Sequence, residues 1–255
     1  MSRMLSLFAS GYAAATDLAT SGRRAEARKA YDALLRQTIT PEERVQTLMA
    51  AGKLAYSAEQ YRRARRHLLA AGRLAPGDAT IQYELGCAFE NDPYGCDRRA
   101  TRRYRKACQL NAKEPIYRAS LGRAMIRIRE LTSGVNVLRR AAKEAPTDVA
   151  VLEVVADGLR EAGRNDLAFN ILSQARFLAP ANGDITRLWS RAKYDLAAEQ
   201  QRITLRSQQR ALPEGHPVAL KLRFAAHPQG QVRRDNGCRP ASHLGRLKAY
   251  NSDLG

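Results

Sequence analysis

The sequence predicts an all-α protein built from tandem antiparallel helix pairs, and three observations support this prediction. A short pattern of small residues recurs at a nearly constant interval along most of the chain. Each recurrence is followed by apolar residues spaced along one helical face, and most repeats close with a proline. Apolar residues make up 44% of the 255 residues but aromatic residues only 6%, which suits thin helices packed closely on each other.

The recurring pattern places small residues at fixed positions in each repeat. Four segments align when each is set to end in Gly or Ala: 49–52, 83–86, 119–122 and 153–156. Their starts are 34, 36 and 34 residues apart. Two further small residues and a proline follow in most repeats. These are Ala64, Gly134 and Ala168, then Ala71, Ala141 and Ala175, and finally Pro76, Pro146 and Pro180.

These small residues have a direct physical reason. Two antiparallel helices of about a dozen residues cannot bury an apolar face alone, so they need a close backbone approach and a stack of neighbours. A Gly or Ala on the first helix and the first small residue of the second helix allow that approach. The later Ala lets the next repeat pack, and the closing proline ends the second helix.

Four repeats in register resemble the tetratricopeptide repeat (TPR) family. The resemblance covers residues 41–180, and a degenerate fifth repeat fits residues 1–40, where Ala14 and Ala15 replace the family's Leu-Gly pair. The resemblance implies a right-handed α-solenoid of about five antiparallel helix pairs. The early aromatic residue of the family is missing from most repeats, in which Leu48, Gln82 and Arg118 stand.

Local signals predict where individual helices begin. Thr40 is expected to cap a helix that has Pro41 at its first position and Glu43 completing a capping box. Pro115 opens another first helix. Aspartates precede three further periodic runs and are predicted to cap them: Asp78, Asp148 and Asp184.

One repeat departs from the regular length. Between Gly86 and Ala107 the spacing is two residues longer than in the neighbouring repeats, and the extra length falls in 90–96. Pro93 and Gly95 predict a longer loop that protrudes between the two helices. We expect a tolerated surface loop, with a contact site as the alternative.

After residue 180 the chain is predicted to close its array and then lose order. Apolar residues at helical spacing, among them Trp189, predict a capping helix over 181–201. From 202 to 255 the helical periodicity fails and prolines recur. This segment contains ten basic and three acidic residues. This composition predicts a basic, largely disordered tail.

The chain is strongly basic, with a net charge of +18 and arginine supplying 35 of its 43 basic residues. One interpretation is a surface that binds polyanions. The other, which we favour, is a compositional habit that places arginine on solvated helix faces. The candidate polyanion surface lies on predicted second helices, on the side away from the groove described below. It comprises Arg62, Arg63, Arg66, Arg99, Arg102, Arg103 and Lys106.

No constellation of residues indicates catalysis, a cofactor or a metal. The sequence has neither a Gly-rich phosphate loop nor a nucleophile elbow, so no catalytic residue is predicted. The four cysteines form no C-x-x-C pair, which predicts reduced thiols in a cytoplasmic protein. No run of about 20 apolar residues occurs, so no membrane partner is expected. The tail residues with metal-binding side chains are spaced too irregularly for a site: His216, His227, Cys238 and His243.

The resemblance to TPR proteins implies the position of a binding site. In that family the first helix of each repeat lines a concave groove that holds an extended peptide. The corresponding residues here are Lys53, Tyr56, Tyr83, Glu90, Arg123, Arg127, Asp157 and Arg160. We therefore predict a non-catalytic interaction module or scaffold with a protein or peptide partner. The alternative is nucleic-acid or polyanion binding through the arginine clusters and the basic tail.

Overall fold

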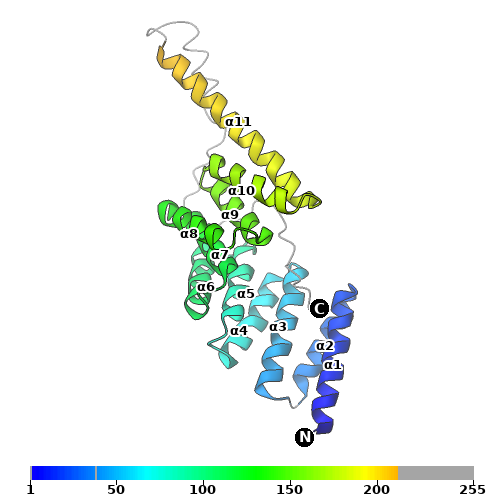
Figure 1. The fold of residues 1–255 in the computed structure, drawn as a ribbon. Helices are drawn as coiled ribbons and strands as arrows, with labels where there is room; N and C mark the ends of the chain where they lie inside the picture. The colour runs from blue at the N-terminus through cyan, green and yellow to red at the C-terminus, as the bar shows by residue number, and fades with distance from the viewer. Residues whose placement is uncertain (1, 38, 212–255) are drawn as a thin grey trace. The chain divides into compact units, whose positions relative to one another are not determined.

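The computed structural model describes residues 2–37 and 39–211, which form eleven helices and no strand. Five consecutive helix pairs are followed by one long helix (Figure 1). The pairs are α1 (Ser2–Thr20) with α2 (Arg24–Arg36), α3 (Pro41–Ser57) with α4 (Tyr61–Leu74), α5 (Ala79–Glu90) with α6 (Asp97–Leu110), α7 (Pro115–Arg127) with α8 (Leu131–Glu144), and α9 (Val149–Glu161) with α10 (Asn165–Leu178). Helix α11 (Gly183–Ala211) follows them. This confirms the predicted helical solenoid of five pairs.

The chain forms two compact units, with the boundary inside α7. Unit 1 contains the described residues up to Tyr117, and unit 2 contains those from Arg118 onward. Within unit 1, each helix from α1 to α5 packs on the next helix in the chain. Within unit 2, α8 packs on α9, α9 on α10, and α10 on α11. Helices that contact mainly their neighbours in sequence are typical of a repeat array.

Glycines on the first helices allow a large side chain of the second helix to lie directly on the backbone. A Cβ atom on Gly86 would lie 2.4 Å from Cε1 of Tyr104, and one on Gly52 would lie 2.9 Å from Cγ of Leu68. Tyr104 and Leu68 are at most 1% exposed. The other predicted small residues are also buried: Ala64, Ala71, Gly134, Ala141, Ala168 and Ala175. The predicted packing positions are therefore confirmed.

The helix caps follow the sequence at most positions. Thr40 and Glu43 form the predicted capping box. The carboxylates of Asp78 and Asp148 each accept backbone N–H groups from the first turn that follows.

The predicted cap at Asp184 is wrong. Asn182 caps α11 instead, by accepting the backbone N–H groups of Asp184 and Ile185 at 3.0 and 3.2 Å. Helix α11 begins at Gly183, so Asp184 already lies inside its first turn, where its carboxylate pairs with Arg187.

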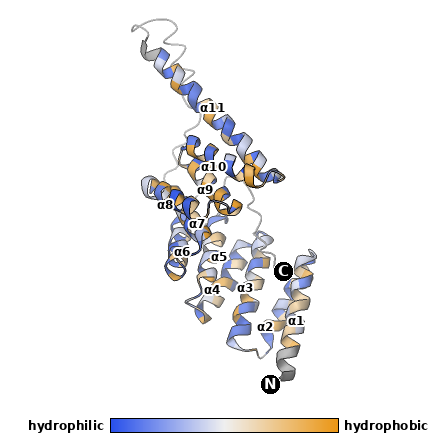
Figure 2. Ribbon diagram, in the orientation of Figure 1, coloured by the Kyte–Doolittle hydropathy of each residue, from blue (hydrophilic) through white to orange (hydrophobic). Residues whose placement is uncertain are grey.

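Two features depart from the regular repeat. Six residues, 91–96, join α5 to α6, whereas three residues join α3 to α4, α7 to α8 and α9 to α10, which confirms the longer loop. Helix α11 continues to Ala211, ten residues beyond the predicted end at 201. Its far half is mostly hydrophilic (Figure 2) and holds no Gly or Pro to stop it. The remaining predicted tail, with His216, His227, Cys238 and His243, lies outside the described residues.

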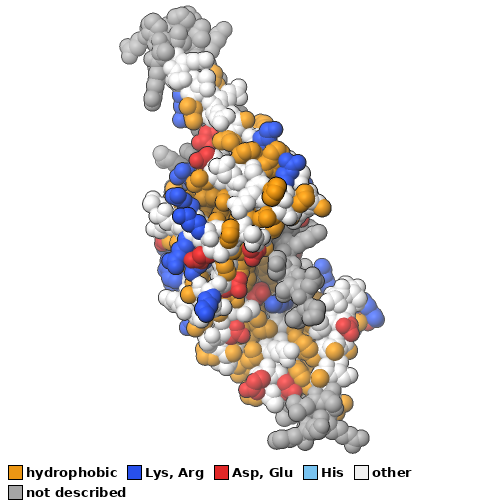
Figure 3. Space-filling view, viewed as in Figure 1, with side chains coloured by type: hydrophobic (Ala, Val, Ile, Leu, Met, Phe, Trp, Pro, Cys, Tyr) orange, Lys and Arg blue, Asp and Glu red, His pale blue; other side chains and the backbone are white. Residues whose placement is uncertain are grey.

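In unit 1, charge is distributed unequally between α5 and the second helices α4 and α6. In unit 1, α4 carries five arginines and no acidic residue, and α6 carries five arginines, one lysine and a single aspartate. The first helix α5 instead carries two glutamates and no basic residue. The face turned to the viewer in Figure 3 shows side chains of both signs interspersed with hydrophobic ones. None of the described helices is both long and apolar enough to cross a membrane.

The close approach of α5 and α6 leads to a stability prediction. We expect Gly86→Ala to lower the free energy of unfolding by about 1–3 kcal/mol, because the new methyl group overlaps the buried ring of Tyr104. Gly77→Ala is the matched control, since no atom lies within 4 Å of its added Cβ. Urea unfolding followed by circular dichroism measures both variants. Equal midpoints for the two would contradict this account of the packing.

Candidate binding face of the first helices

The predicted groove residues lie on one side of the first helices, which we call the first-helix face. In unit 1 this face is formed by α3 and α5, and in unit 2 by α7, α9 and α11. In both units, side chains on this face contact side chains about one repeat away in the sequence.

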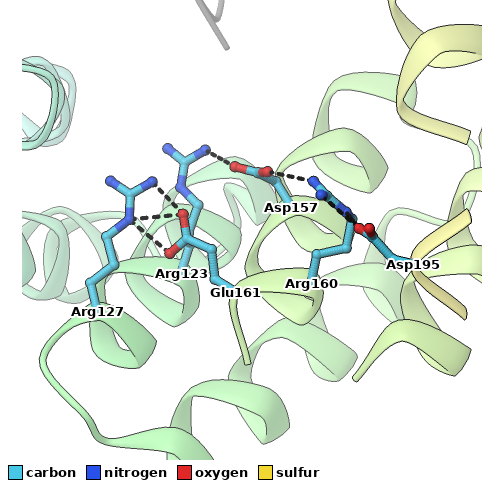
Figure 4. A network of polar contacts seen from close by, with 6 residues as sticks. All are labelled: Arg123, Arg127, Asp157, Arg160, Glu161 and Asp195. Atoms are coloured by element: carbon cyan, nitrogen blue, oxygen red, sulfur yellow. Dashed lines mark hydrogen bonds and ion pairs between the residues drawn. The ribbon is translucent and has the colours of Figure 1, made fainter. Parts of the chain in front are cut away.

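In unit 2 the contact with the most hydrogen bonds joins Arg127 on α7 to Glu161 on α9. The Arg127 guanidinium donates through Nε and Nη2 to both carboxylate oxygens of Glu161, at 2.7–3.1 Å (Figure 4). The two side chains are 19% and 29% exposed. A paired fork of this kind fixes the orientation of both groups more firmly than a single contact does.

A second series of contacts continues from α7 to α11. Arg123 lies 3.6 Å from Asp157, which also lies 3.6 Å from Arg160. Arg160 in turn donates to Oδ2 of Asp195 through Nη2 at 2.9 Å and through Nε at 3.2 Å. Figure 4 shows these alternating charges side by side across the three helices. The face of unit 2 is therefore mixed in sign and largely neutralised by its own pairs.

Arg123 differs from the other predicted groove residues because it is buried. Its side chain is 4% exposed. Helix α9 approaches closely here, since a Cβ atom on Gly158 would lie 3.3 Å from Cβ of Arg123. The stem of Arg123 therefore belongs to the contact between α7 and α9, and its charge meets Asp157. The sequence pattern alone did not predict this burial.

A further carboxylate, Glu153 on α9, is affected by the same network. Burial raises the pKa of Glu153, the nearby carboxylates of Asp184 and Asp157 raise it further, and Arg123 opposes the shift. The raised pKa of Glu153 therefore results first from desolvation of its carboxylate, and the two neighbouring carboxylates add to it.

In unit 1 the corresponding contacts involve tyrosines as well as charges. The hydroxyl of Tyr56 accepts a hydrogen bond from Nδ2 of Asn91 at 2.7 Å, and its ring meets Tyr61 edge-on at 5.6 Å. Lys53 pairs with Glu84 at 3.4 Å. Burial raises the pKa of Glu84, and the ammonium of Lys53 opposes that shift.

Tyr83 and Glu90 lie on the same helix, α5, and both contact neighbours. The ring of Tyr83 stacks on Tyr117, with centroids 4.8 Å apart, and lies 5.7 Å from the ring of Tyr104. The carboxylate of Glu90 accepts a hydrogen bond from the hydroxyl of Tyr104 at 2.6 Å. Unit 1 thus presents a more aromatic first-helix face than unit 2.

Comparisons with known proteins identify the fold. No protein-family model matches the chain, and no curated protein matches its sequence. TTC0263, a thermophilic TPR protein of Thermus thermophilus, superposes on 73% of this chain and 99% of its own with a TM-score of 0.60 and 15% identity. The chain has the tetratricopeptide-repeat fold. YrrB, a TPR protein with an unusual peptide-binding site, matches 71% of this chain and 88% of its own, with a TM-score of 0.51 and 18% identity.

A third structure extends the comparison to a larger protein. The Cut9–Hcn1 hetero-tetramer of the APC/C matches 70% of this chain with a TM-score of 0.54 and 20% identity. This chain spans only 35% of the length of that matched chain. At sequence identities of 15–20% the similarity shows the TPR fold alone. What the other proteins bind is therefore not transferred to this chain.

The arginines of the predicted polyanion surface do not behave as one group in this TPR structure. Arg63 pairs with Asp32 at 3.1 Å, Arg99 lies 6.0 Å from the ring centroid of Phe89, and Arg103 donates to Gln82 at 3.0 Å. Burial and the neighbouring Arg102 lower the pKa of Arg103. The remaining members are exposed and have no ion pair within the described part of the chain: Arg62, Arg66, Arg102 and Lys106. Polyanion binding stays a prediction.

Sequence reasoning did not identify the partners of the groove residues. Asn91, Glu161 and Asp195 were all missed as members of the face. Their contacts with Tyr56, Arg127 and Arg160 span 35, 34 and 35 residues, which is the repeat interval of the TPR pattern. A search for a complementary side chain one repeat downstream of each groove residue would have found them.

The Arg127–Glu161 pair yields a prediction about coupling. In a double-mutant cycle with Arg127→Ala and Glu161→Ala, we expect a coupling energy of about 0.5–1 kcal/mol, because the paired hydrogen bonds hold two half-buried groups together. The control cycle uses Arg164 and Asp166, which lie 3.7 Å apart and are more than half exposed. Thermal unfolding measures both cycles. A coupling no larger than the control's would contradict the assigned geometry.

Proposed function

We propose that this TPR protein is a non-catalytic scaffold that binds an extended peptide or protein segment across its first-helix face. The TPR fold supports a role in protein–protein interaction in general, and YrrB is described as having a peptide-binding site. The observation that supports a binding site on the first-helix face is the series of arginine–carboxylate pairs on α7, α9 and α11. Its carboxylates are held by arginines yet stay about a third exposed, at 33% for Asp157, 29% for Glu161 and 32% for Asp195.

Pairing of these side chains favours ligand binding in two ways. Side chains already fixed by a partner lose less conformational entropy when a ligand arrives. Asp157 also keeps acceptor capacity, because both of its arginine contacts, at 3.6 Å, exceed hydrogen-bond distance. Its oxygens can therefore accept N–H groups of a peptide, while the charge of the buried Arg123 holds the carboxylate in place.

The first-helix face of unit 1 supplies a different kind of contact. Tyr56 and Tyr83 are partly exposed and held in place by neighbouring rings. Tyrosine is enriched in protein interfaces because it combines a large apolar ring with a polar tip. We assign to these rings the apolar side chains of a segment bound at unit 1. The face of unit 2, considered by itself, would engage the backbone and charged groups of a segment bound there.

A catalytic role is not part of the proposal. Burial raises the pKa of Cys87 to about 12, so its thiol is protonated at neutral pH and is a poor nucleophile. Among the described residues, no group of three His, Cys, Asp or Glu side chains is arranged to hold a metal ion. The cytoplasmic location stays a prediction.

The test begins with a random peptide library panned on the full-length protein. The affinities of the selected peptides are then measured by fluorescence anisotropy. We expect Asp157→Asn to weaken them about tenfold, because a carboxylate that accepts hydrogen bonds is replaced by a neutral amide. Asp166→Asn on α10 makes the same chemical change outside the face and should alter affinity by less than about twofold.

Two results would contradict the proposal. One is a library that yields no peptide of measurable affinity. The other is a set of selected peptides whose affinity falls equally in the Asp157 and Asp166 variants, or in neither. Circular dichroism confirms beforehand that both variants are folded.

A further inference from the structure

An open cleft of about 740 Å³ lies in unit 1, at the edge where the helices of a pair are joined. One wall is the first two turns of α4, and the other is residues 92–94 of the α5–α6 loop. The lining includes Arg62, Arg66, Asp92 and Tyr94. The cleft contains none of the predicted groove residues, so it is a surface separate from the first-helix face.

Two of the four arginines on the α4 wall are used to hold the cleft together. Arg63 pairs with Asp32 on α2 at 3.1 Å. Arg65 pairs with Asp92 of the loop, donates to the backbone oxygen of Ala88 at 3.0 Å, and lies over the ring of Phe89. The contacts of Arg65 fix α4 to the loop and to the end of α5, so they join the two walls of the cleft, whereas the Arg63 pair holds α4 to α2.

The other two arginines on this wall, Arg62 and Arg66, form no ion pair with an acidic side chain in the described part of the chain. Both are exposed and lie one helical turn apart. The first turn of α4 contains no acidic residue to offset them. Two guanidinium groups at this spacing can engage carboxylates by paired hydrogen bonds.

The opposite wall presents an aromatic side chain on a well-held loop. Tyr94 is 92% exposed. Its backbone N–H donates to Oδ1 of Asp92 at 3.0 Å, and the N–H of Gly95 donates to the backbone oxygen of Asp92 at 2.7 Å. Only glycine fits at position 95, because a Cβ atom there would lie 1.9 Å from the backbone oxygen of Phe89. The backbone at Tyr94 is therefore already ordered, and its exposed ring is available to a ligand.

We propose that this cleft binds an acidic peptide segment of a partner protein. Its carboxylates are engaged by Arg62 and Arg66, and an apolar side chain of the segment packs on Tyr94. A peptide fits better than a nucleic acid, because nucleic-acid sites of this type use several aromatic platforms along an extended basic track, whereas the cleft has one exposed ring on the loop wall.

The probe is a short fluorescein-labelled peptide of glutamates around one central phenylalanine, and an oligothymidylate of equal charge is the comparison ligand. Binding to the full-length protein is measured by anisotropy at an ionic strength of about 0.15 M. We expect the peptide to bind, and the double variant Arg62→Glu, Arg66→Glu to weaken it about tenfold or more. Tyr94→Ala should weaken it about threefold to fivefold.

Helix α11 provides matched controls. Arg202 and Arg206 form a second exposed arginine pair one turn apart, and Tyr194 is a second exposed tyrosine, at 74%. Charge reversal of both arginines, and Tyr194→Ala, should each change the affinity by less than about twofold. Asp157→Asn should also leave this probe unaffected, which separates the cleft from the first-helix face.

Several outcomes would overturn the proposal. One is that the peptide does not bind at about 1 mM protein. Another is that charge reversal of Arg202 and Arg206 on α11 lowers the affinity as much as charge reversal of Arg62 and Arg66. The third is that the oligothymidylate binds more tightly than the peptide and loses its affinity in the Arg62→Glu, Arg66→Glu variant. The last result would assign the cleft to nucleic acid. If charge reversal on α4 disturbs folding, Arg62→Gln with Arg66→Gln tests the same contacts, with a smaller but measurable loss expected.

Discussion

The close approach of neighbouring helices at small residues is the constraint on which the rest of the structure depends. Leu138 of α8 shows the effect of this close approach. A Cβ atom added to Gly122 of α7 would lie 2.8 Å from Cγ of Leu138, and one added to Gly158 of α9 would lie 2.7 Å from its Cδ1. One buried side chain thus fixes two successive first helices relative to each other. Larger residues at either glycine would separate the helices, and the contacts on the first-helix face would be lost with them.

That constraint explains why the first-helix face and the second helices carry different chemistry. Residues on successive first helices meet one repeat apart, so a charge there is matched by a charge on the next helix, as Arg160 is matched by Asp195 at 2.9 Å. On the second helices this matching is less complete: Arg63 of α4 pairs with Asp32 of α2, but Arg62, Arg66, Arg102 and Lys106 have no ion pair in the described part of the chain. The arginines of α4 and α6 can therefore accumulate without destabilising the packing. The two proposed binding surfaces follow from this division, one mixed in sign and fixed by its own pairs, the other basic.

Much of the fold was predictable because its determinants are local. Small residues at helix crossings, the capping box at Thr40 and the longer α5–α6 loop all act within one repeat, where sequence patterns are informative. The candidate site was less predictable because it depends on neighbours in the next repeat. The burial of Arg123 results from the approach of Gly158, and α11 continues to Ala211 because no helix breaker interrupts it. The cap at Asn182 was missed because Asn and Asp are about equally favoured as N-caps and Asp184 stands closer to the periodic apolar residues.

The central claim is that the first-helix face is held in a fixed arrangement before any ligand binds. Arginine Nε–Hε resonances in NMR spectra of the free protein test it most directly, because Arg127 and Arg160 both donate through Nε. Their Nε–Hε groups should exchange with water more slowly than those of the exposed Arg62 and Arg202, and their resonances should shift when a selected peptide is added. Exchange as fast as at the exposed arginines, with peptide-induced shifts confined to the second helices, would contradict the account.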